Sequence, residues 1–140
     1  MMKILIVDGQ GGRLGKQLVK EVLERFPQAE LSAVGTNSMA TEQMLKAGAP
    51  RAATGENAVV VASRRADVIL GPVGIVIADA LMGEVTPDMA KAVGQSDAVR
   101  ILLPHDKCNT MVAGVGDAGM SALIEDAMEK LRIVLQNYQG

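Results

Sequence analysis

The sequence predicts a three-layer α/β fold, in which a doubly wound and mostly parallel sheet of five or six strands carries helices on both faces. Short apolar runs alternate with segments of helical periodicity, and this alternation favours right-handed crossovers between parallel strands. The apolar runs are continuous, as in strands that are covered on both faces. The chain has 140 residues, of which 49% are hydrophobic. That size suits one core, and we expect a single domain over residues 1–140.

The first half of the chain predicts strands and helices in alternation. Apolar residues at helical spacing over residues 14–26 indicate an amphipathic helix that ends before Pro27. A second helix follows the capping residue Ser38 and stops at Gly48. For residues 57–62 the periodicity leaves a helix and a strand both open. The strands expected in this half are 3–7, 31–34 and a short one near 51–53.

The second half predicts two further strands and ends in a long helix. Residues 67–70 and 100–103 are predicted strands, whose apolar runs begin after Asp67 and Arg100 and stop at Gly71 and Pro104. Residues 111–113 are a candidate edge strand. The helices expected in this half are 74–81, 87–93 and the amphipathic segment 118–136.

Composition and charge exclude several classes of partner. The net charge is −2 and no basic run is present, so neither nucleic acid nor an anionic membrane is an expected partner. The single cysteine and single histidine form neither a disulfide nor, alone, a zinc site, and we expect no metal. The longest uncharged apolar stretch, residues 68–78, is too short to span a bilayer. We expect a cytoplasmic protein, and a homo-oligomer would hide part of its aliphatic surface.

A glycine-rich loop follows the first predicted strand and opens the first predicted helix. A sharp turn there needs positive φ, and a missing Cβ lets the backbone approach a ligand. The exposed N–H groups and the helix dipole then favour an anion, so we expect a phosphate-bearing ligand at this loop. The residues expected to contact it are Gly9, Gln10, Gly11, Gly12, Arg13, Leu14 and Gly15.

Other polar or glycine-rich segments follow the remaining strands. Because the carboxyl ends of parallel strands meet at one edge of a sheet, these segments are expected to converge on a crevice there. Turn formation and helix capping explain each of them equally well. The residues added to the predicted ligand site from these segments are Thr36, Asn37, Ser38, Gly71 and Gly74.

Four residues are candidates for chemistry, each with a simpler reading beside it. Asp8 and Glu56 can face the crevice as general acid and base, or as solvated turn residues. Cys108 and His105 lie three residues apart, and a thiol beside an imidazole can be a nucleophile. A free cysteine is more often a small buried hydrophobe. Lys107 is a further candidate phosphate contact.

The spacing of Gly9, Gly12 and Gly15, G-x-x-G-x-x-G, is similar to that of Rossmann reductases of the dihydrodipicolinate-reductase and atypical short-chain type. The resemblance implies a Rossmann-like fold and a cofactor, NADP or NAD, whose pyrophosphate contacts this loop. No carboxylate ends the second strand, and the small polar groups at residues 36–38 suit a 2′-phosphate. A P-loop is the competing reading, but Gln10 and Gln17 stand where it requires Gly and Ser or Thr.

Three strings also resemble a family of short bacterial proteins that is catalogued as a domain of unknown function: residues 8–12, 34–38 and 53–58. The resemblance implies a bacterial cytoplasmic protein and no particular reaction. Three functions therefore stay open. They are a nucleotide- or dinucleotide-binding protein such as an oxidoreductase, a non-enzymatic regulatory or assembly module that senses a small metabolite, and a transferase or hydrolase that uses Cys108, His105 or Glu56.

Overall fold

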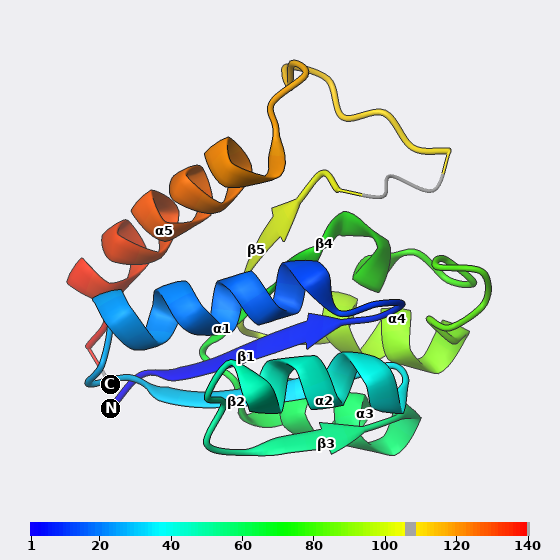
Figure 1. Cartoon of the computed structure of the whole chain (residues 1–140), viewed down its shortest axis with the longest axis horizontal. Coiled ribbons are helices and arrows are strands. Elements are labelled where there is room, and N and C mark those ends of the chain that lie inside the picture. The colour runs from blue at the N-terminus through cyan, green and yellow to red at the C-terminus, as the bar shows by residue number, and fades with distance from the viewer. Residues whose placement is uncertain (106–108, 140) are drawn as a thin grey trace.

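A computed structural model describes residues 1–105 and 109–139. Its centre is one sheet in which every strand runs parallel to its neighbours (Figure 1). The strand order is β3-β2-β1-β4-β5. The strands are β1 (Lys3–Asp8), β2 (Glu30–Gly35), β3 (Ala52–Thr54), β4 (Val68–Pro72) and β5 (Val99–Leu103). The predicted α/β fold class, with a doubly wound parallel sheet, is confirmed.

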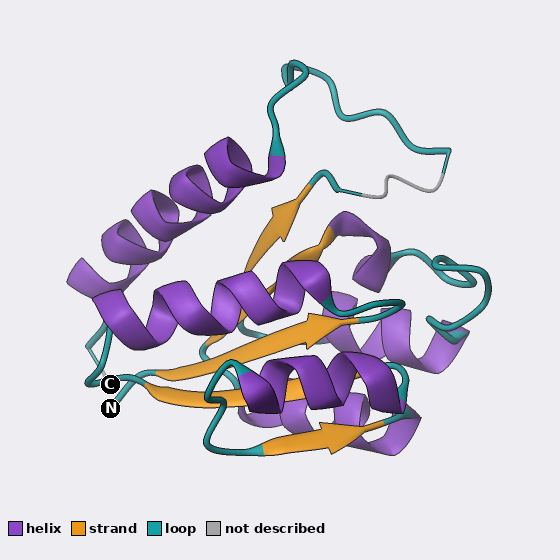
Figure 2. Ribbon diagram, in the orientation of Figure 1, coloured by secondary structure: helices purple, strands orange, loops and turns teal. Residues whose placement is uncertain are grey.

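Helices cover both faces of this sheet (Figure 2). One face packs against α1, α2 and α5, and the other packs against α3 and α4. A short 3₁₀ helix, η1, follows β4 directly. The helices are α1 (Arg13–Arg25), α2 (Ser38–Lys46), α3 (Glu56–Arg65), η1 (Val73–Val76), α4 (Pro87–Gln95) and α5 (Met120–Gln136). The segment left open at residues 57–62 is therefore helical.

The central strand β1 shows why the apolar runs are continuous. Ile4 and Ile6 belong to the core on the α1 face, whereas Leu5 and Val7 belong to the core on the α3 face. All four side chains are at most 2% exposed. Burying one such side chain contributes about 1.5–3 kcal/mol, so β1 holds both layers together.

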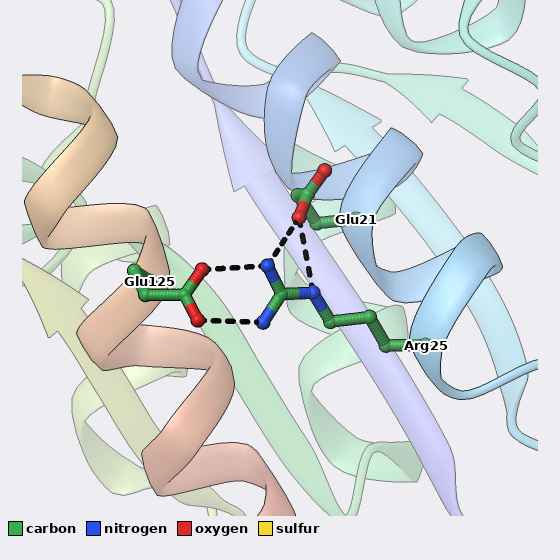
Figure 3. A network of polar contacts seen from close by, with 3 residues as sticks. All are labelled: Glu21, Arg25 and Glu125. Atoms are coloured by element: carbon green, nitrogen blue, oxygen red, sulfur yellow. Dashed lines mark hydrogen bonds and ion pairs between the residues drawn. The ribbon is translucent and has the colours of Figure 1, made fainter.

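Helices α1 and α5 pack side by side and are also joined at their surface. Arg25 of α1 donates hydrogen bonds of 3.0 and 2.6 Å to the two carboxylate oxygens of Glu125 on α5 (Figure 3). Arg25 also pairs with Glu21 one turn earlier, at 2.8 Å. These hydrogen bonds, first that to Glu125, raise the pKa of the Arg25 guanidinium. Because the pair is exposed, solvent screens it and its contribution to stability is small.

Two predicted elements are wrong. Residues 74–81 are not a helix, because η1 ends at Val76 and a chain of turns follows it. Residues 111–113 form no strand and lie in an exposed loop between β5 and α5. Both segments are apolar, but apolarity alone does not distinguish a regular element from a turn that points one side chain inward. Among the described residues no sixth strand is present.

The strand order places a switch point between β1 and β4. From β1 the chain winds outward through β2 and β3, and it then returns through α3 to β4 on the other side. In open parallel sheets of this kind, ligands bind beyond the carboxyl ends of the strands at the switch point. The glycine loop follows β1 and η1 follows β4, so both lie at that edge.

Candidate functional site

The loop between β1 and α1 is a tight turn that closes on itself. The Gly12 amide donates to the Gly9 carbonyl at 3.0 Å, and Gln10 and Gly12 have φ values of 49° and 75°. Glycine suits this left-handed backbone at residue 12. A Cβ there would also lie 2.8 Å from Ala40 Cα, so Gly12 lets α1 and α2 approach. The sharp turn expected between strand and helix is therefore present.

The Asp8 carboxylate accepts a hydrogen bond from one of the backbone amides that the sequence predicts as ligand contacts. Its Oδ2 accepts a buried hydrogen bond of 2.6 Å from the Gly15 amide. A Cβ on Gly15 would lie 2.7 Å from Met44 Sδ and 2.8 Å from Asp8 Cβ. Gly15 therefore permits close packing of α1 on the sheet, and its N–H group faces the protein's own carboxylate.

Three other backbone amides at the start of α1 donate no such hydrogen bond. Within the described part of the chain, no acceptor is hydrogen-bonded to the N–H groups of Gly11, Arg13 or Leu14. Gly11 and Arg13 are exposed, and a Cβ on Gly11 would meet open space. The first turn of α1 carries no acidic side chain. This helix start therefore keeps three unpaired N–H groups, whereas the Asp8 carboxylate at Gly15 offsets part of the positive charge of the helix dipole.

Glu84 is the residue that sequence reasoning missed. Its Oε1 accepts hydrogen bonds of 2.8 Å each from the Gln10 amide, the Thr36 hydroxyl and the Asn37 side-chain amide. Partial burial works to raise the pKa of the Glu84 carboxyl, but these hydrogen bonds outweigh it and hold the pKa below its ordinary value. The carboxylate is therefore ionised at neutral pH. Its contact with Gln10 spans 74 residues, and no local pattern signals such a contact.

Glu84 belongs to a loop, residues 77–86, that covers the first turn of the glycine loop. Leu81 of this loop is 4% exposed. A Cβ on Gly9 would lie 2.8 Å from Leu81 Cδ1 and 2.9 Å from Glu84 Oε1. Asp79, Leu81 and Met82 all have positive φ, a left-handed conformation that is strained for residues other than glycine.

The end of β2 contributes two of its three predicted residues to this cluster. Thr36 and Asn37 bind Glu84, and Asn37 also donates to the Gln10 carbonyl at 2.9 Å. Asn37 in addition caps α2 by accepting from the Ala40 amide. Ser38 is exposed, and the described residues offer its side chain no hydrogen bond. The position expected to suit a 2′-phosphate is therefore occupied by a negative charge.

Gly71 and Gly74 lie at the same edge of the sheet, but the protein's own atoms surround them. A Cβ on Gly71 would lie 2.3 Å from the Val7 carbonyl oxygen, so this glycine lets β4 run close to β1. Gly74 is buried in η1, where its carbonyl accepts from the Ile77 amide. Their contact with a ligand stays a prediction.

The candidates for chemistry that the structure describes come from different elements. Asp8 is turned to Gly15, whereas Glu56 on α3 accepts a 2.6 Å hydrogen bond from the Thr86 hydroxyl. His105 follows β5, and its amide donates to the Leu103 carbonyl. Lys107 and Cys108 lie outside the described residues. Among the residues described, no three His, Cys, Asp or Glu side chains gather as metal ligands would.

Two surface hollows lie away from the glycine loop. One, of about 400 Å³, is bounded by β1, β2, β3 and α3 and is rimmed by Lys3, Arg51 and Arg65. The other, of about 620 Å³, lies between α3 and α4 and includes Ser63 and Lys91. None of the helices in the described part combines the length and the apolarity that crossing a bilayer requires.

The parallel sheet, its switch point and the glycine loop define a Rossmann-like α/β protein. The chain belongs to the family described as a domain of unknown function, DUF3842, which matches residues 3–136. This confirms the resemblance seen in the sequence. No curated protein matches the chain.

One solved structure that resembles the chain is a dodecameric FMN-dependent UbiX-like decarboxylase from Escherichia coli O157:H7. It shares 18% sequence identity, with a TM-score of 0.43 over 91% of this chain and 75% of that one. A likeness of this size assigns neither a flavin nor a decarboxylation to the present chain.

Proposed function

We propose that this protein binds a small phosphate-bearing ligand of the nucleotide or dinucleotide class at the start of α1. One observation carries the proposal: the N–H groups of Gly11, Arg13 and Leu14 have no acceptor among the described residues. They begin a helix of 13 residues whose first turn holds no acid. Backbone amides in this arrangement bind phosphate oxygens well, because the helix dipole adds to their hydrogen bonds.

The position of these amides in the fold supports the same function. They follow β1 at the switch point of the sheet, where doubly wound proteins bind their ligands. Gly11 is exposed and has open space around it, so an outside group reaches the backbone there without a steric obstacle. The Arg13 side chain is exposed beside it and adds positive charge.

The choice between the two expected dinucleotides depends on Glu84. NADP would place its 2′-phosphate beside Thr36 and Asn37, and both already bind the Glu84 carboxylate. Two anions at that place repel each other, so NADP binds only if Glu84 moves away. NAD carries no 2′-phosphate, so its ribose brings no second anion to this place.

Substitutions at Gly11 test the proposal. Gly11→Asp places a carboxylate in front of the free amides, and the open space around residue 11 accommodates it. Gly11→Asn has nearly the same shape without the charge and is the matched control. Titration calorimetry with pyrophosphate, ADP and NAD should show binding to the wild type and to Gly11→Asn. We expect binding to Gly11→Asp to be at least about tenfold weaker, which corresponds to about 1.4 kcal/mol.

Two results would count against the proposal. Equal affinity of the Asp and Asn variants would mean that the ligand binds elsewhere. A wild-type protein that binds none of the three compounds at millimolar concentration would remove the function itself. Circular dichroism of both variants shows whether the fold is kept.

A further inference from the structure

We propose that Glu84 is a built-in competitor for the ligand, and that a phosphate group binds by displacing its carboxylate. The inference rests on the proposed function and adds a regulatory step to it. In the structure Glu84 fills an oxyanion cradle formed by the Gln10 amide, the Thr36 hydroxyl and the Asn37 side-chain amide.

The chemistry of the cradle is that of an anion site. Three donors converge on a single oxygen, Glu84 Oε1, each at 2.8 Å. A carboxylate oxygen and a phosphate oxygen accept the same hydrogen bonds, and both form stronger ones than a neutral group. The three donors come from residues that the sequence predicts as ligand contacts. The protein's own carboxylate thus stands where an oxygen of the ligand is expected.

A phosphate has an advantage over Glu84 at this place. The cradle residue Gln10 is followed at once by Gly11, whose amide has no acceptor among the described residues. A phosphate carries several oxygens, so it can satisfy the cradle and the free amides of Gly11 and Arg13 together. The single carboxylate of Glu84 leaves those amides unpaired, and its exchange for a phosphate therefore gains hydrogen bonds.

The 77–86 loop is anchored on both sides of Glu84. Ala80, Leu81 and Val85 are buried in the core on the α3 face. The two sides of the loop also pair with each other, because the Asp79 amide donates to the Val85 carbonyl at 2.7 Å and the Val85 amide donates to the Ala80 carbonyl. The half-buried Glu84 side chain can therefore leave the cradle while the loop stays in place.

Two variants in the same loop separate this inference from a merely structural role of Glu84. Glu84→Gln keeps the size of the side chain and removes its charge, which weakens its hold on the cradle. Met82→Ala changes a side chain that is 96% exposed and is the matched control. In calorimetry with inorganic pyrophosphate, Glu84→Gln should bind about fivefold more tightly than the wild type. Met82→Ala should bind as the wild type does.

A second readout follows the cradle without any ligand. Hydrogen exchange of the Gln10 amide should be slow in the wild type and in Met82→Ala, and faster in Glu84→Gln. Adding pyrophosphate to the wild type should shift the amide resonances of Gly83 and Glu84, because the Glu84 carboxylate leaves the cradle. Glu84→Asp retains the charge on a shorter side chain that reaches the cradle poorly, and it should also bind pyrophosphate more tightly than the wild type.

The outcomes are distinguishable. Equal affinity of the wild type, Glu84→Gln and Glu84→Asp would overturn the competitor role and leave the proposed function intact. Weaker binding by both Glu84 variants would also overturn it, because Glu84 would then assist the ligand. If no variant and no wild-type protein binds pyrophosphate, the proposed function fails and this inference fails with it.

Discussion

Asp8 and Glu84 are two carboxylates that contact the glycine loop in different ways. Asp8 is buried and binds the Gly15 amide inside the molecule, whereas Glu84 is half-buried and reaches the loop from outside. Asp8 lies next to the loop in the sequence, so the sequence offers it as a candidate acid or base. No local pattern indicates Glu84, since its partners lie 47 to 74 residues away along the chain.

The Glu84 contacts predict a pH dependence of stability. Its pKa is lower in the folded protein than in the unfolded chain, so the unfolded state takes up the proton first as the pH falls. The stabilisation is therefore fully present above the ordinary pKa of about 4.5 and is lost as the pH falls through the folded value. We expect the free energy of unfolding of the wild type to fall toward that of Glu84→Gln below about pH 4.5.

Urea unfolding of both proteins between pH 3 and pH 7 measures this dependence. A difference between them that stays constant over the whole range would contradict the assigned hydrogen bonds. Glu24→Gln, on the exposed side of α1, is the control for loss of a carboxylate as such.

At the scale of the elements, the sequence predicted the helices and strands whose apolar residues recur at a single helical or strand spacing. Helix α1 buries Leu14, Leu18 and Val22 at helical spacing, and its amphipathic pattern places it correctly. The loop at 77–86 has no such period. Leu81 is buried there by a turn, in a left-handed conformation, and joins the core on the α3 face. The sequence pattern therefore indicated a helix where the chain makes successive turns.

The approach of β4 to β1 gives a prediction about stability. Gly71→Ala would place a Cβ 2.3 Å from the Val7 carbonyl oxygen. That oxygen belongs to the backbone of β1 and can shift only slightly. We expect a loss of about 3 kcal/mol in the free energy of unfolding. Gly94→Ala in α4, where a Cβ meets open space, should instead stabilise by about 0.5 kcal/mol.

Chemical denaturation of the two glycine variants tests this packing. A Gly71→Ala protein as stable as the wild type would show that β1 and β4 separate at little cost. A loss in Gly94→Ala as large as that in Gly71→Ala would mean that the clash with the Val7 carbonyl is not what excludes a side chain at residue 71.

At the scale of the whole molecule, alternation of strands and helices was enough to predict a doubly wound sheet. The strand order was not, because it depends on how α3 carries the chain from β3 back to β4 across the sheet. The site was predicted in part. The glycine loop and the end of β2 meet at one edge as expected, whereas the loop that covers them arrives from the far side of the switch point.

The expected homo-oligomer stays a prediction at this scale. Residues 109–119, which lead into α5, extend away from the sheet (Figure 1). Residues 111–119 are exposed, and Met111 is 96% exposed. Apolar side chains in such a position suit contact with another molecule.

The binding of phosphate at the start of α1 is tested most directly by amide chemical shifts during a pyrophosphate titration. The start of α5 is an internal control, because it is also a helix terminus without an acid in its first turn. The account predicts saturable shifts of the Gly11, Arg13 and Leu14 amides, with small and unsaturated shifts at Ser121 and Ala122. Equal shifts at both helix starts, or none at either, would contradict it.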